Sequence, residues 1–126
     1  MVIILDDVIS NIDVVNQKIL SILEDKNHSQ DWCSFDTNHD FKDFCVKFIN
    51  IASNYFDLSS CVGYEFWTQN NTRPSQWHYD KDERLLEEKG ILDYPLCSMV
   101  YYPLVENLEG GQLHIECDII TPKANR

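Results

Sequence analysis

Two stretches in the first half of the chain carry apolar residues at helical spacing. In the first, they recur at steps of three or four residues: Ile9, Ile12, Val15, Ile19 and Ile22. In the second, after Asp40, they form one stripe: Phe41, Phe44, Cys45, Phe48, Ile51, Ala52 and Tyr55. We therefore predict two amphipathic helices that bury these faces, the first capped by Ser10. A short β-rich run, Val2 to Leu5, precedes them.

The pattern changes after Leu58, where apolar and polar positions alternate from Cys61 to Thr68 as in a strand. We predict further strands over residues 76–82, 96–104 and 111–117, and a short helix over 83–89 that ends at Gly90. Two helices followed by consecutive strands favour an α+β fold, in which the helices support a largely antiparallel sheet or barrel. The prediction is one domain, 1–126, with a helical part (1–58) and a sheet part (59–126).

Composition and charge narrow the class of protein. A chain of 126 residues with 44% hydrophobic and 25% charged residues is typical of one globular domain. Twenty-one acidic and ten basic residues give a formal charge of −11, which repels phosphate backbones and anionic lipids. We therefore expect neither nucleic acid nor a membrane as a partner. With no apolar run near the roughly 18 residues of a membrane span and no basic leader, we expect a cytoplasmic protein.

The five cysteines are odd in number and widely spaced, and no two of them form a Cys-x-x-Cys pair. This pattern favours reduced packing residues over a disulfide framework or a zinc site.

Candidate chemistry begins with His78 and Asp80, which lie two residues apart in the predicted strand 76–82. Such residues project from the same face, about 7 Å apart along the backbone. An imidazole and a carboxylate supply two of the three ligands of the 2-His-1-carboxylate triad that binds iron(II). The pattern is common by chance and recurs at His114-Ile115-Glu116, so the ordinary alternative is a polar pair on an exposed strand.

Three elements in order resemble one family. They are Trp77-His78-Tyr79-Asp80, then Val100-Tyr101-Tyr102, then Gly110-Gly111-x-Leu113-x-Ile115 running on to Ile120-Thr121-Pro122-Lys123-Ala124-Asn125-Arg126. With these elements, residues 62–126 resemble the iron(II)/2-oxoglutarate-dependent oxygenases of the prolyl-hydroxylase-like branch. The resemblance implies a double-stranded β-helix of the jelly-roll type, which residues 1–58 would support as helices.

The resemblance also implies residue roles. His78 and Asp80 would bind iron, Tyr102 or, as second choice, Tyr101 would line the 2-oxoglutarate pocket, and Trp67 would wall the site. Adjacent strand residues point to opposite faces, so only one of the two tyrosines faces the pocket, and the sequence leaves open which. The implied cofactors are iron(II) and 2-oxoglutarate, with ascorbate as a candidate reductant. The implied reaction is hydroxylation of a protein side chain of prolyl type or of a small molecule.

One departure from the family bears on activity. The family's distal histidine and the basic residue for 2-oxoglutarate follow the segment that matches 122–126, whereas this sequence stops at Arg126. We therefore expect an incomplete β-helix with poor turnover. His114 lies where the family places no ligand.

Two other hypotheses remain open. The first is a noncatalytic remnant that acts as an interaction module and self-associates through unpaired strand edges. Iron-dependent succinate production separates it from the enzyme. The second takes Asp80, Asp82 and Glu83 as a magnesium or manganese site. For Asp82 and Glu83, a position at the start of the short helix is the ordinary alternative.

Overall fold

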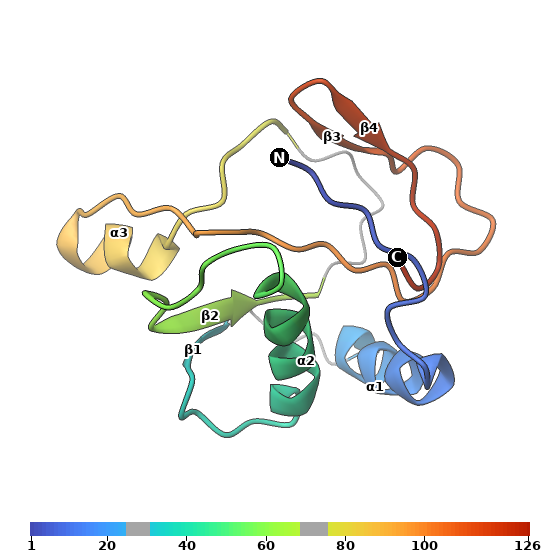
Figure 1. Ribbon diagram of the computed structural model, residues 1–126, viewed down its shortest axis with the longest axis horizontal. Coiled ribbons are helices and arrows are strands. Elements are labelled where there is room, and N and C mark those ends of the chain that lie inside the picture. Colours follow the sequence, from blue (N-terminus) through green and yellow to red (C-terminus); the bar gives the residue numbers. More distant parts are fainter. Residues whose placement is uncertain (25–30, 69–75) are drawn as a thin grey trace. The chain divides into compact units, whose positions relative to one another are not determined.

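A computed structural model describes residues 1–24, 31–68 and 76–126 of the chain. Within them it contains three helices and four short strands (Figure 1). The helices are α1 (Ile12–Glu24), α2 (Lys42–Ala52) and α3 (Glu83–Lys89), and the strands are β1 (Asp31–Ser34), β2 (Gly63–Phe66), β3 (Leu113–Ile115) and β4 (Asp118–Ile120). The predicted α+β class is confirmed.

Contacts divide the chain into two compact units. Of the described residues, one unit holds 1–24, 68 and 100–126, and the other holds 31–67 and 76–99. The first unit therefore contains α1, β3 and β4, and the second contains β1, α2, β2 and α3.

In the second unit, β1 and β2 pair antiparallel, with Cys33 opposite Tyr64 and Ser34 opposite Gly63. The close packing of β1 against β2 leaves no room for a side chain at Gly63. A Cβ atom at this position would collide with the carbonyl oxygen of Cys33 and would lie 2.8 Å from Cζ2 of Trp32. The absent side chain therefore lets the Trp32 ring and the β1 backbone approach β2 closely.

Helix α2 confirms the second predicted helix and its buried stripe as far as Ala52, whereas Tyr55 follows the helix and is exposed. Phe41, Cys45 and Ala52 are buried, and the tilted rings of Phe44 and Phe48 contact each other with centroids 4.7 Å apart. The Phe41 ring lies nearly parallel to that of Phe66 on β2, at 6.2 Å and 11°. These contacts form an aromatic core between α2 and the β1–β2 pair.

Helix α3 covers the residues predicted for it. The Asp82 carboxylate accepts a hydrogen bond from the Leu85 backbone N–H at 2.7 Å and caps the helix. Gly90 ends it in the left-handed region, at φ 65°. The backbone N–H of Asp82 also donates to the Asp93 carbonyl at 3.0 Å, which joins the segments on either side of α3.

In the first unit, α1 begins at Ile12, so Asn11 and not the predicted Ser10 stands directly before it. Ile9 and Ile19 are buried, as is Ile120 at the end of β4. Strands β3 and β4 form an antiparallel hairpin in which Leu113 faces Ile120. The predicted strand 111–117 is thus shortened to β3, and β4 is added after it.

Several strand predictions are wrong. Residues 76–82 and 96–104 contain no strand, whereas β1 was not predicted. A strand forms only where a second strand completes its hydrogen bonds. Between 76 and 82, the backbone bond from Asp82 to Asp93 does not extend into a ladder. Both sheets in the described part of the chain are two-stranded, and they do not close into a barrel.

All five cysteines are free thiols. Cys33 and Cys45 are buried, as expected for packing residues, whereas Cys117 is exposed. Burial raises the pKa of the Cys45 thiol to about 11, so this thiol stays protonated at neutral pH. Among the helices described, none is both long and apolar enough to cross a membrane.

Candidate functional site

His78 and Asp80 lie in the irregular segment that leads into α3. Their side chains approach each other, with Nε2 of His78 3.7 Å from Oδ1 of Asp80. The His78 side chain is 65% exposed and that of Asp80 is 32% exposed. The structure therefore brings the two predicted ligands together at a solvent-accessible position, although not on a strand.

The hydrogen bond at the other ring nitrogen determines the tautomer of His78. Nδ1 lies 2.7 Å from the backbone carbonyl oxygen of Gln76. A carbonyl oxygen can only accept, so Nδ1 carries a proton, and Nε2 is the ring nitrogen that lies on the Asp80 side. Metal-binding histidines commonly donate their second N–H to a backbone carbonyl in this way.

The 3.7 Å between Nε2 of His78 and Oδ1 of Asp80 is an ion-pair distance. Two ligand atoms that share one ion lie about 3 Å apart, so the pair would have to close slightly to hold a metal. In the described ranges no group of three His, Cys, Asp or Glu side chains could hold a metal ion. His114 lies on β3, in the other unit, with an exposed side chain.

The carboxylates of the alternative magnesium hypothesis have other partners. Asp82 caps α3 through Oδ1. Oε2 of Glu83 lies 3.5 Å from Nζ of Lys81. Asp82 and Glu83 thus take the helix-start positions that the sequence offered as the ordinary alternative.

The remaining predicted site residues lie in two places. Trp67 follows β2, in the same unit as His78 and Asp80, and is 43% exposed. Tyr101 and Tyr102 belong to the other unit and are half-buried. Burial raises the pKa of both phenols, an effect that nearby Arg126 opposes at Tyr102.

Asn125, which sequence reasoning did not single out, is a buried polar residue of the first unit. Its Oδ1 accepts from the Ile9 backbone N–H at 3.0 Å, and its Nδ2 donates to the Ile9 carbonyl at 2.9 Å. The Tyr101 hydroxyl donates to the same Oδ1 at 3.1 Å. Tyr102 exchanges backbone hydrogen bonds with this segment, accepting from Asn125 N–H at 2.8 Å and donating to the Arg126 carbonyl at 3.0 Å. The residues around Ile9, Tyr101 and Asn125 are therefore joined into one hydrogen-bonded cluster.

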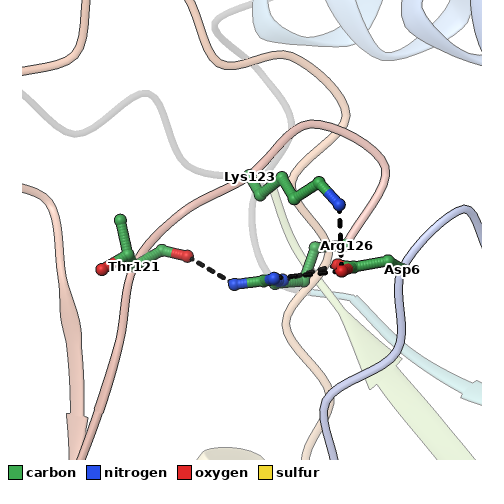
Figure 2. A network of polar contacts seen from close by, with 4 residues as sticks. All are labelled: Asp6, Thr121, Lys123 and Arg126. Carbon is green, nitrogen blue, oxygen red and sulfur yellow. Dashed lines mark hydrogen bonds and ion pairs between the residues drawn. The ribbon is translucent and has the colours of Figure 1, made fainter.

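A charged network lies beside this cluster (Figure 2). The Asp6 carboxylate accepts from Nε and Nη2 of Arg126 at 2.7 and 3.1 Å and from Nζ of Lys123 at 3.0 Å. Nη1 of Arg126 donates to the Thr121 carbonyl at 3.0 Å. The hydrogen bonds from Arg126, and then those from Lys123, hold the pKa of Asp6 well below its usual range. The spacing of 117 to 120 residues explains why no local sequence pattern marks the network.

His39 and Tyr64 form a second polar pair that the sequence did not reveal. Nδ1 of His39 accepts from the Phe41 backbone N–H at 3.2 Å. Nε2 must therefore carry the ring proton, and it donates to the Tyr64 hydroxyl at 2.7 Å. The His39 ring also stacks on Phe66 at 4.9 Å and 12°. These contacts use both nitrogens of His39 in holding the start of α2 against β2, which favours a structural role.

Comparisons with models of protein families, with curated proteins and with solved structures find no match for this chain. A functional assignment therefore depends on the residues themselves.

Proposed function

We propose that the chain is an iron(II)- and 2-oxoglutarate-dependent hydroxylase domain of the prolyl-hydroxylase-like type. The observation that carries the proposal is the His78–Asp80 pair. Its Nε2 and its carboxylate oxygen lie 3.7 Å apart, and the bond from Nδ1 to the Gln76 carbonyl leaves Nε2 as the nitrogen that could bind a metal. A double-stranded β-helix is the fold that we propose on the family resemblance, and the two antiparallel strand pairs, β1–β2 and β3–β4, are its support in the described residues.

The residues of this chain would act as follows. His78 keeps its proton on Nδ1 through Gln76 and presents Nε2 to the metal, while Asp80 supplies a negative charge. Iron(II) with 2-oxoglutarate supplies the activation of oxygen that amino acid side chains cannot perform. The family resemblance implies that Tyr102 would donate its hydroxyl to a carboxylate of 2-oxoglutarate and that Trp67 would wall the site. The substrate is a protein side chain or a small molecule.

The alternative is a noncatalytic interaction module. Two features favour it. Only two ligands converge in the described part of the chain, and many large apolar side chains are exposed, including Val62, Val100 and Ile119. Apolar side chains that gather into one exposed patch are typical of a surface that binds another chain. The module binds neither iron nor 2-oxoglutarate, and it releases no succinate.

The test is anaerobic calorimetry with iron(II). We expect His78→Ala and Asp80→Ala each to abolish binding, because one remaining ligand leaves an open, weak site. His114→Ala is the matched control, since His114 has the same spacing to an acid at Glu116 and should leave the affinity unchanged. Unchanged iron affinity in both the His78 and the Asp80 variant would exclude the metal assignment.

A further inference from the structure

Three aromatic side chains are exposed on the segments that flank α3. Trp77 and Tyr79 precede the helix and are 75% and 83% exposed, and Tyr94 follows it and is 55% exposed. The rings of Tyr79 and Tyr94 meet edge to face, with centroids 6.2 Å apart and planes at 73°. The backbone hydrogen bond from Asp82 to Asp93 holds the two segments side by side. We call these three residues the aromatic surface.

The charge around the aromatic surface is negative. Residues 76–99 contain six acidic and three basic side chains. Two of the three basic groups are paired within the same region, Lys81 with Glu83 at 3.5 Å and Arg84 with Glu88 at 2.8 Å. Asp80 and Asp93 stand next in sequence to Tyr79 and Tyr94. A cation that approaches the aromatic surface is therefore attracted by carboxylates as well as by the ring faces.

We propose that the aromatic surface docks an extended protein segment rich in lysine or arginine. The faces of Trp and Tyr rings attract ammonium and guanidinium groups, and the flat guanidinium also stacks on them. A second copy of this chain is a poor occupant, because each copy carries a formal charge of −11. The phosphates of a nucleic acid are repelled for the same reason.

The aromatic surface also adjoins the proposed metal site. Trp77 and Tyr79 alternate with His78 and Asp80 along one short segment. A basic segment bound to the two rings therefore spans the stretch of chain that carries the His78–Asp80 pair. The inference that a side chain of this docked segment is the substrate rests on the proposed function, and it favours a protein substrate over a small molecule. Docking itself does not require iron.

The experiment uses the metal-free chain and three labelled peptides of equal length, in which glycine alternates with arginine, glutamine or glutamate. Fluorescence anisotropy is measured at about 0.15 M salt, where the Debye length is about 8 Å and distant charges are screened. We expect the arginine peptide alone to bind. Trp77→Ala and Tyr79→Ala should each weaken its binding about two- to fivefold, as expected for the loss of one exposed cation–π contact. Tyr79→Phe, which keeps the ring, should retain the affinity.

Tyr55→Ala is the matched control, because Tyr55 is an exposed tyrosine of the same unit, at 46%, outside the aromatic surface. It should bind the arginine peptide as the unaltered chain does. If Trp77→Ala and Tyr79→Ala bind the arginine peptide as tightly as the unaltered chain does, the proposal is overturned, since only general electrostatic attraction would remain. Equal binding of the glutamine peptide would also overturn it, as would a concentration-dependent mass in sedimentation that Trp77→Ala abolishes.

Failure of this inference is distinguishable from failure of the proposed function. His78→Ala should lose iron and still bind the arginine peptide. A chain that binds the peptide but no iron contradicts the proposed function alone, and a chain that binds iron but no peptide contradicts the docking surface alone.

Discussion

Replacing Asn125 tests the hydrogen-bonded cluster of the first unit. The Asn125→Ala change removes three side-chain hydrogen bonds, two to the backbone of Ile9 and one to the Tyr101 hydroxyl. At about 1 kcal/mol each, their loss costs about 3 kcal/mol, and it leaves the N–H and C=O of buried Ile9 without these partners. Asn125 also has φ 60°, where alanine is less favourable than asparagine, which adds about 1 kcal/mol. The expected total of about 4 kcal/mol is a large part of the stability of a small domain.

The assay is urea unfolding followed by far-ultraviolet circular dichroism, which reports on α1 in the same unit, combined with a double-mutant cycle. Tyr101→Phe alone should cost about 1 kcal/mol, because it removes one of the three bonds. In the Asn125→Ala background the same change should cost almost nothing, since the acceptor is already gone. The cycle thus isolates the Tyr101–Asn125 bond from general effects of either change. A cost below about 1 kcal/mol for Asn125→Ala, or fully additive costs in the cycle, would refute the reasoning.

Three further outcomes follow from other contacts. The pKa of Asp6 is lowered in the folded chain, so its stabilising effect is present above the ordinary pKa of about 4 and is lost as pH falls below that value. The urea midpoints of the unaltered chain and Asp6→Asn should therefore converge on acidification, and parallel pH profiles would contradict this. Gly63→Ala should lower stability by about 1–3 kcal/mol in the same unfolding assay, because the new methyl group meets the Cys33 carbonyl. An unchanged midpoint would show that β1 moves away freely. If the proposed function holds, Tyr102→Phe should weaken 2-oxoglutarate binding by about 1.5–3 kcal/mol in a titration. Tyr101→Phe should not, and the reverse result would place Tyr101 in the pocket.

The helices could be predicted because their determinants lie within a few residues of one another. The stripe from Phe41 to Ala52 marks α2, and its residues are buried or half-buried as the spacing indicates. Helix α3 has both its limits in the sequence, with Asp82 to cap it and Gly90 to end it. The start of α1 was predicted less well, since the sequence offers both Ser10 and Asn11 as polar residues before the first turn.

Strands were predicted poorly because each depends on a partner distant in the sequence. Strand β1 is four residues long, too short to show alternation, and it exists because β2 pairs with it. The segment 76–82 does alternate, yet it lies beside the segment after α3 without forming a ladder. The contacts of the candidate site residues depend on sequence distance in the same way. The approach of His78 to Asp80 could be expected from a spacing of two, whereas the pairing of Asn125 with Ile9 joins residues 116 positions apart.

The sequence pattern leaves open which of Tyr101 and Tyr102 faces the 2-oxoglutarate pocket. The hydrogen bond from Tyr101 to Asn125 bears on this choice. The Tyr101 hydroxyl donates to Asn125, so this ring faces the cluster around Ile9. Both backbone groups of Tyr102 bond to the 125–126 segment, which holds residues 101 and 102 extended along it. Consecutive side chains of an extended segment point to opposite sides, so the Tyr102 ring faces away from the Asn125 side chain. If the proposed function holds, Tyr102 is therefore the phenol left to bind a carboxylate of the co-substrate, because the Tyr101 hydroxyl is already bound to Asn125.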